Sequence, residues 1–190
     1  EKQGAAAIAG SAALRFGAGL VTLVHKNSSK KGLDIFPELM VSSEIPEKTN
    51  VIAFGMGLGR KDEAAQIYFD YILEHGNIKC VIDADACHAQ GLKSFLEKKE
   101  KGVVLTPHPK EFQAMLKNCD LGEYSVEECV LNRMELAEKF CRKFPKKTLV
   151  LKGANLIIAH FDGFKFKLFV NPFGQPCLAK AGSGSEEHTS

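Results

Sequence analysis

The sequence predicts an α/β fold, in which a mainly parallel β-sheet lies between helices on both of its faces. Three observations lead to this prediction. Short apolar runs recur along the chain, helix-forming stretches separate them, and glycine or polar residues follow each run. Parallel strands have such uninterrupted apolar sequences because helices cover the sheet on both sides. The 190 residues are enough to bury the core of a single domain.

The first expected element is a helix over residues 4–16, which are rich in alanine and contain no run of β-branched residues. Residues 17–19 end this helix, because glycine readily adopts the left-handed backbone that terminates helices. A strand is expected at 20–24. A second short strand is expected at 39–41, within a less regular region, and residues 46–50 form a loop.

Strands and helices then alternate. Buried strands are expected at 51–54, 80–82, 103–105 and 149–151. A helix over 62–74 follows the first of them, because its apolar residues recur at helical spacing. One helix is expected directly after residue 109. A longer one is expected over 125–144, where Ser125 and Glu128 have the spacing of a capping box.

The ends of these strands carry the polar and glycine-rich residues of the chain. In parallel sheets, ligands bind beyond the carboxyl ends of the strands. We therefore expect four loops to line one edge of the sheet: 55–59, 83–85, 106–109 and 152–154. The last two apolar runs, 157–159 and 164–170, are joined by a short Asp-Gly turn, which predicts a hairpin.

The glycine-rich loop 55–59 follows a strand and precedes a helix. Its backbone amides could approach a phosphate closely, because no side chains intervene. The loop is similar to a dinucleotide fingerprint, but its third glycine comes two positions after the second instead of three. A tight turn between strand and helix remains the alternative.

Two carboxylates, Asp83 and Asp85, follow the next strand. They could hold magnesium or a water network around phosphates, and the alternative is a helix cap. Cys87 and His88 come shortly afterwards. A zinc site is disfavoured there, because the sequence has no second pair of ligands at metal-binding spacing.

His108 lies between two prolines, which fix the loop. We therefore expect the imidazole to be presented to a ligand and not packed. Glu111 opens the next helix, where an acid suits the helix dipole. The alternative is a satisfied surface histidine beside a capping acid. Lys152, directly before Gly153, suits phosphate contact, although a lysine at a strand end can also lie along apolar surface.

Composition excludes several classes of protein. Hydrophobic residues make up 45% and charged residues 25%, which excludes a disordered chain. The formal charge of +2 gives no general reason to bind nucleic acid or acidic lipid. No apolar stretch approaches the roughly 18 residues of a membrane span. The six scattered cysteines contain no C-x-x-C pair and predict reduced thiols in the cytoplasm.

Taken together, the loops resemble one family, the NAD(P)H-hydrate dehydratases. The resemblance covers nearly the whole chain and rests on motifs that occur in the family's order. They are AALRFGAGLVT at 12–22, GMGLGR at 55–60, VIDADA at 81–86, TPHPKEF at 106–112, VLKGA at 150–154, NPFG at 171–174 and AGSG at 181–184.

The resemblance implies a ribokinase-like three-layer sandwich and the repair of a damaged cofactor. ADP or ATP, with Mg²⁺, would phosphorylate the hydroxyl of the hydrated nicotinamide ring, and loss of phosphate would restore NAD(P)H. The TPHP form resembles the ADP-using branch. Two alternatives stay open: a ribokinase-like kinase of a small vitamin alcohol, and a nucleotide-binding fragment without catalysis. The resemblance also implies a homo-oligomer and a fused epimerase domain in a longer chain.

The resemblance also implies roles for individual residues. Those expected to contact the hydrated dinucleotide are Ala5, Gly57, Gly59 and His108. Those expected to hold the adenine nucleotide are Lys152, Gly153, Ala154, Asn155, Leu156 and Gly184. Those expected in the polar network around phosphates and magnesium are Asp83, Asp85 and Glu111, with no residue assigned as a direct metal ligand.

One departure from the family affects catalysis. The family has an aspartate after its GSG motif as the general base, and this chain has Ser185 there. A serine accepts a proton poorly at neutral pH, so we expect the chain as written to be nearly inactive. We interpret 1–184 as the dehydratase domain, lacking elements at both ends, and 185–190 as a polar, non-native tail.

Overall fold

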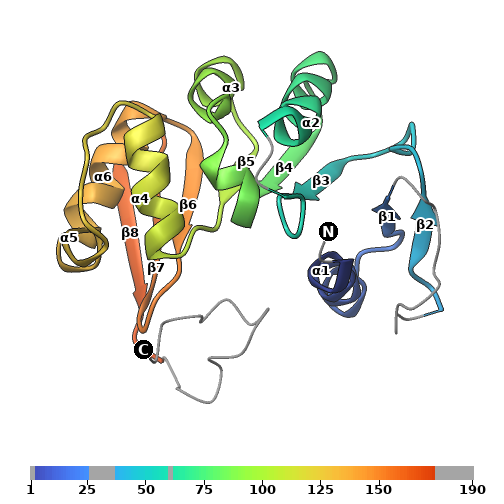
Figure 1. Ribbon diagram of the computed structural model, residues 1–190. Coiled ribbons are helices and arrows are strands. Elements are labelled where there is room, and N and C mark those ends of the chain that lie inside the picture. The colour runs from blue at the N-terminus through green and yellow to red at the C-terminus, as the bar shows by residue number, and fades with distance from the viewer. Residues whose placement is uncertain (1–2, 26–36, 60–61, 174–190) are drawn as a thin grey trace.

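The computed structural model describes residues 3–25, 37–59 and 62–173. Its main feature is a six-stranded sheet in the order β3-β4-β5-β6-β7-β8 (Figure 1). These strands are β3 (Val51–Phe54), β4 (Lys79–Ile82), β5 (Val103–Leu105), β6 (Lys147–Leu151), β7 (Leu156–Phe161) and β8 (Phe166–Asn171). The first four pair in parallel and the last two antiparallel, which confirms the mainly parallel sheet and the hairpin.

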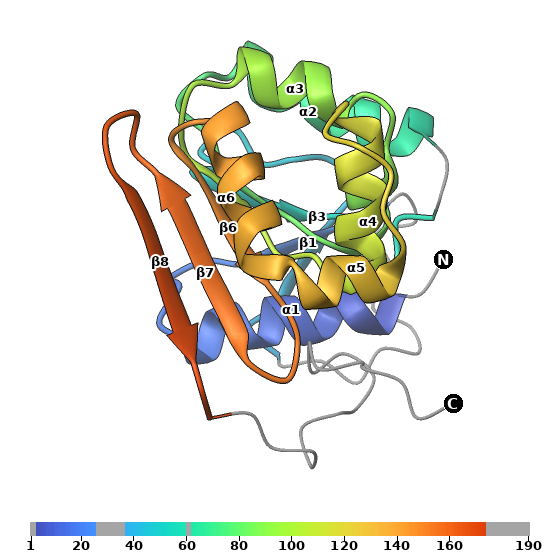
Figure 2. The ribbon, with the colours of Figure 1, turned by 90° about the vertical axis from the view of Figure 1, so that its left-hand side faces the viewer.

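Helices connect the parallel strands. They are α2 (Asp62–Glu74), α3 (Leu92–Lys98), α4 (Pro109–Asn118), α5 (Val126–Leu131) and α6 (Arg133–Lys143). Since the strand order follows the chain and crossovers are right-handed, these connections cover one face of the sheet. The helix α1 (Gln3–Arg15) lies on the opposite side of β3 from α2 and α3 (Figure 2). The fold is therefore α/β, with the connecting helices on one face of the six-stranded sheet and α1 on the other side of β3.

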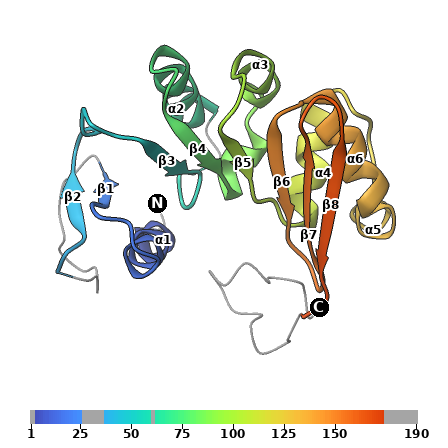
Figure 3. The same ribbon diagram turned by 180° about the vertical axis from the view of Figure 1, so that it is seen from behind.

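A separate two-stranded parallel sheet follows α1. It joins β1 (Thr22–Val24) to β2 (Met40–Ser42). The helix ends where predicted, and Gly17 has the left-handed backbone expected there, with φ of 96°. The first strand is shorter than the predicted 20–24, because pairing with β2 begins only at Thr22. The β7–β8 hairpin lies at the other end of the structure (Figure 3).

The core lies between the sheet and the connecting helices. In β3, Ile52 and Phe54 are buried while the alternate residues are exposed, so only one face of this strand packs against helices. Phe69 of α2 and Phe95 of α3 are both buried, and their rings stack with centroids 4.7 Å apart. None of the helices in the described ranges is both long and apolar enough to cross a membrane.

Two sequence-based predictions need correction. The single helix expected at 125–144 is two helices, α5 and α6, which meet at Asn132 with φ of −101° and ψ of 20°. A short 3-10 helix, η1 (Ala84–His88), and α3 were not predicted. Both are only one or two turns long, so the helical period has little room to repeat.

The capping box at the start of α5 is confirmed, because Ser125 Oγ accepts from Glu128 N and the Glu128 carboxylate accepts from Ser125 N. Replacing Ser125 by alanine should lower the free energy of unfolding by about 1 kcal/mol. Urea denaturation measures this change. Glu127→Gln, an exposed neighbour in the same turn, is the control and should change stability by less than about 0.5 kcal/mol. Equal effects would contradict the capping role.

Candidate active site

The four predicted loops converge at the carboxyl ends of β3, β4, β5 and β6. Adjacent loops are joined by backbone hydrogen bonds. Asp83 N donates to Phe54 O (3.1 Å), Thr106 N to Ile82 O (3.0 Å), and Lys152 N to Pro107 O (2.9 Å). The register of the parallel pairs therefore places these loops along one edge, as the sequence predicted.

The glycine-rich loop after β3 is a tight turn built on three left-handed residues. The φ angles of Gly55, Gly57 and Gly59 are 109°, 70° and 86°. Leu58 N donates to Gly55 O across the turn (3.2 Å). A β-carbon on Gly55 would overlap the carbonyl oxygen of Asp83, so this glycine is also required for close contact between neighbouring loops.

The two aspartates that follow β4 contact different loops. Asp83 Oδ1 accepts from Lys152 Nζ at 2.8 Å, and Asp85 Oδ2 accepts from Gly59 N at 2.9 Å. Asp83 occupies the N-cap position of η1, but its side chain makes no capping hydrogen bond. The helix-cap alternative for Asp83 is therefore wrong.

The imidazole of His108 is used inside its own loop. Its Nδ1 accepts from Lys110 N (3.1 Å) and Glu111 N (3.3 Å), and its Nε2 lies 3.1 Å from Glu111 Oε1. Glu111 Oε2 in turn accepts from His108 N at 2.8 Å. The expectation of a presented, unpacked imidazole is wrong. Proline at the first position of α4 has no amide hydrogen, and His108 caps the next two amides.

Glu111 is buried within a charged network. Its carboxylate also lies 3.8 Å from Lys152 Nζ, and both side chains are shielded from solvent. Burial alone would raise the pKa of Glu111. The hydrogen bonds with His108 and the charge of Lys152 outweigh burial and leave that pKa below its usual range. The carboxylate is therefore charged at neutral pH and faces the ammonium group.

Lowering the pH should weaken the fold through Glu111. Because its folded-state pKa lies below the ordinary value of about 4.5, its stabilising contribution is complete above that value. The contribution is lost as the pH falls through the folded-state pKa. We expect the stability difference between the protein and its Glu111→Gln variant to be larger at about pH 7 than at about pH 3.5, as measured by urea unfolding.

Glu63→Gln serves as the control for this measurement, because Glu63 is an exposed acid in the first turn of another helix, α2. The control variant should show little of this pH dependence. A stability difference for Glu111→Gln that stays constant between the two pH values would contradict the charged network.

Metal binding finds little support among the described residues. They contain no group of three or more potential ligands arranged to hold a metal ion. One carboxylate oxygen of Asp83 accepts from Lys152 Nζ, and one of Asp85 accepts from Gly59 N, so the role of these acids around magnesium stays a prediction. Cys87 is fully buried, and burial, with Glu111 and Asp83 nearby, raises the pKa of its thiol well above its usual range. That thiol is neutral.

The remaining predicted residues lie in several places. Ala5 is half-buried in the first turns of α1, whose start lies near the loop after β3 in all three views (Figures 1 to 3). Gly153, Ala154 and Asn155 form the turn between β6 and β7, and Leu156 begins β7. Gly184 and Ser185 lie outside the described residues.

One contact in this region has no signal in the sequence. Arg133, at the start of α6, donates from Nη1 to the carbonyl oxygen of Asn155 at 3.1 Å. The two residues are 22 positions apart, and no motif includes Arg133. The bond fixes the turn that follows Lys152.

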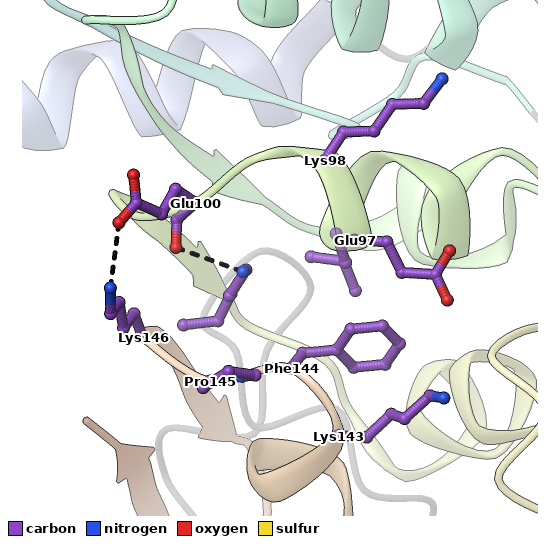
Figure 4. A pocket seen from close by; sticks show the side chains of 9 residues that line it. Glu97, Lys98, Glu100, Lys143, Phe144, Pro145 and Lys146 are labelled. Carbon is purple, nitrogen blue, oxygen red and sulfur yellow. Dashed lines mark hydrogen bonds and ion pairs between the residues drawn. The ribbon is translucent and has the colours of Figure 1, made fainter. Parts of the chain in front are cut away.

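A hollow of about 370 Å³ lies elsewhere, between the end of α3 and the segment that joins α6 to β6 (Figure 4). Phe144 is among the residues that line it, and Lys146, another of them, pairs with Glu100 (2.9 Å). Since these segments precede β5 and β6, the hollow lies at the amino ends of those strands. It is therefore separate from the candidate active site.

The sequence model that describes NAD(P)H-hydrate dehydratases matches residues 1–185. The chain belongs to the NAD(P)H-hydrate dehydratase family. It is 38% identical over 185 residues to the "Bifunctional NAD(P)H-hydrate repair enzyme Nnr" of Helicobacter pylori, covering 95% of this chain and 36% of the relative. It is 31% identical to the "ADP-dependent (S)-NAD(P)H-hydrate dehydratase" of Bacillus subtilis, covering 95% of this chain and 63% of that protein.

The fold agrees with this family membership. A solved ribokinase-like superfamily protein from Enterococcus faecalis superimposes with a TM-score of 0.68 at 26% sequence identity. The match covers 96% of this chain and 64% of the other. The ribokinase-like architecture predicted from the motifs is therefore confirmed. The chain spans about a third of the length of the Helicobacter relative and just under two thirds of the others.

Proposed function

We propose that this protein takes part in the ADP-dependent dehydration of hydrated NAD(P)H, with its site at the carboxyl edge of β3 to β6. The observation that carries the proposal is the Lys152 ammonium group, held between Asp83 and Glu111 at the same edge of the sheet as the glycine turn. A fixed cation and closely approachable backbone are what a phosphorylated ligand requires. The family match supplies the reaction class.

The proposed reaction has two steps. The β-phosphoryl group of ADP passes to the ring hydroxyl of the hydrated nicotinamide, leaving AMP. The carbon–oxygen bond then breaks, phosphate departs, and loss of a proton from the adjacent ring carbon restores the double bond. Lys152 would stabilise the charge that develops on the transferred group. Magnesium usually arrives bound to the phosphates of the nucleotide.

The two ligands would occupy different parts of the edge. The hydrated dinucleotide would lie over Ala5, the glycine turn and the His108 loop. The adenine nucleotide would lie over 152–156 and Gly184. His108 has both ring nitrogens engaged, so we assign it a role in shaping the loop rather than in donating a proton.

Two further proposals concern a second activity and the cellular compartment. One relative is named as bifunctional, and we propose that the dehydratase works beside an epimerase activity.

The cysteines within the described ranges, five in number, are all free thiols. This suits the reducing cytoplasm. Assembly into a homo-oligomer stays a prediction.

The proposal is tested by following the ADP-dependent formation of NADH from chemically hydrated NADH. Three proteins are compared: this chain, its Ser185→Asp variant, and that variant followed by the matching C-terminal segment of the Bacillus relative. General-base assistance is worth roughly 10²–10⁴-fold, so the third protein should be the fastest and the first nearly inactive.

Two results would contradict the proposal. One is the absence of ADP-dependent NADH formation by the third protein. The other is phosphorylation of a small vitamin alcohol in place of the hydrated cofactor, which would favour a kinase. Normal turnover by the unaltered chain would show instead that Ser185 does not occupy the catalytic position.

A further inference from the structure

We propose that Asp83 and Asp85 are positioning residues that hold the two halves of the site separately. Asp85 holds the glycine turn on the dinucleotide side, and Asp83 holds Lys152 on the nucleotide side. This inference rests on the proposed function, because it assigns one ligand to each half. It differs from the role in a magnesium network that the sequence suggested for these two acids.

The first half of the proposal concerns Asp85 and the glycine turn. Asp85 Oδ2 accepts from Gly59 N at 2.9 Å, and Asp85 N donates to Gly55 O at 3.3 Å. Asp85 therefore contacts both ends of the turn. Three left-handed glycines give that turn much conformational freedom, which these two bonds restrict. An ordered turn presents its backbone to a ligand at a lower entropic cost.

The second half concerns Asp83 and Lys152. Asp83 Oδ1 lies 2.8 Å from Lys152 Nζ, whereas Glu111 Oε2 lies 3.8 Å away. Asp83 is thus the nearer of two carboxylates, and its side chain is 23% exposed against 16% for Lys152. A flexible lysine loses less entropy on binding phosphate when its ammonium group is already fixed.

The backbone at Ala84, between the two aspartates, allows Asp83 and Asp85 to contact different loops. Its φ of 48° is left-handed, a conformation that costs about 1–2 kcal/mol for a residue with a β-carbon. Had β4 continued, side chains two positions apart would have shared one face of the strand. The turn at Ala84 instead starts η1 and directs the two carboxylates to different loops. Such backbone strain persists where the surrounding contacts maintain it.

The test measures the affinities of the protein and its variants for ADP and for hydrated NADH by calorimetry. Asp85→Ala should raise the dissociation constant for hydrated NADH about 10-fold and change that for ADP less than about 2-fold. Asp83→Ala should show the reverse pattern. Asp85→Asn keeps an acceptor for Gly59 N and should recover part of the loss.

Thermal unfolding of each variant shows whether it is folded, and the near-isosteric Asp83→Asn and Asp85→Asn substitutions replace any alanine variant that is not. Asp70→Asn, an exposed acid on α2 that accepts from Gln66, is the control and should change neither affinity.

Several outcomes would overturn the inference. Equal losses for both ligands would show a general structural role. Tighter ADP binding by Asp83→Ala would show that this carboxylate competes with phosphate for Lys152. A higher Mg²⁺ requirement in both variants would show a metal-binding role. If the unaltered protein binds neither ligand, the proposed function is contradicted as well. If it binds both ligands but the two alanine variants do not affect different ligands, only this inference is contradicted.

Discussion

Replacing Lys152 by methionine is expected to weaken ADP binding about 10- to 100-fold, because a hydrogen bond between charged groups is worth about 1.5–3 kcal/mol. The substitution removes the cation that is held between Asp83 and Glu111. It also leaves the buried Glu111 carboxylate with less compensation, so the free energy of unfolding should fall. Calorimetric titration with ADP and urea denaturation measure the two effects.

Lys110→Met is the matched control for this substitution. Lys110 is a lysine in the first turn of α4, directly after the loop 106–109 at the same edge of the sheet, but its side chain is exposed. Its loss changes the net charge equally and should leave ADP affinity within about 2-fold. Similar losses for the two variants would mean that overall charge, and not the position of Lys152, governs nucleotide binding.

Replacing Gly55 by alanine is expected to destabilise the protein by about 2–5 kcal/mol, from left-handed strain and overpacking together. The added β-carbon would overlap the Asp83 carbonyl oxygen and come within 2.9 Å of Ala86 Cβ. Relief requires the loops after β3 and β4 to separate. Binding of both ligands should therefore weaken together with stability, as calorimetry and urea denaturation would show.

Gly163→Ala distinguishes the effect of backbone strain from the effect of overpacking. Gly163 has φ of 107°, nearly the same as Gly55 at 109°, but no atom lies within 4 Å of its would-be β-carbon. It should lose only about 1–2 kcal/mol from backbone strain. If the two variants are destabilised equally, the close contact between the loops is not what requires Gly55.

Much of the fold could be predicted because its signals are local. The bounds of β3 and α2 are those expected, since an apolar run, a glycine-rich loop and a helical period follow one another there. The prediction of a single helix over 125–144 was wrong, because the capping box indicates where the helix starts but nothing local marks the break at Asn132. The convergence of the loops followed from parallel pairing alone.

The partners of the site residues could not be predicted from local patterns. Lys152 and Asp83 are 69 positions apart, and only the sheet order brings them together. His108 was expected to face a ligand because prolines flank it. The same proline at the start of α4 is what makes His108 the helix cap, so both ring nitrogens are engaged. Residue type and spacing indicated which loops lie at the same edge of the sheet. They did not indicate which atoms each side chain contacts.

The most direct test of the central claim is a crystal structure of the protein with ADP and hydrated NADH. We expect the phosphates of ADP to lie within hydrogen-bonding distance of Lys152, and the dinucleotide to lie over the turn formed by Gly55, Gly57 and Gly59. Binding of either ligand at the opposite end of the sheet, in the hollow beside Phe144, would contradict the assignment of the active site.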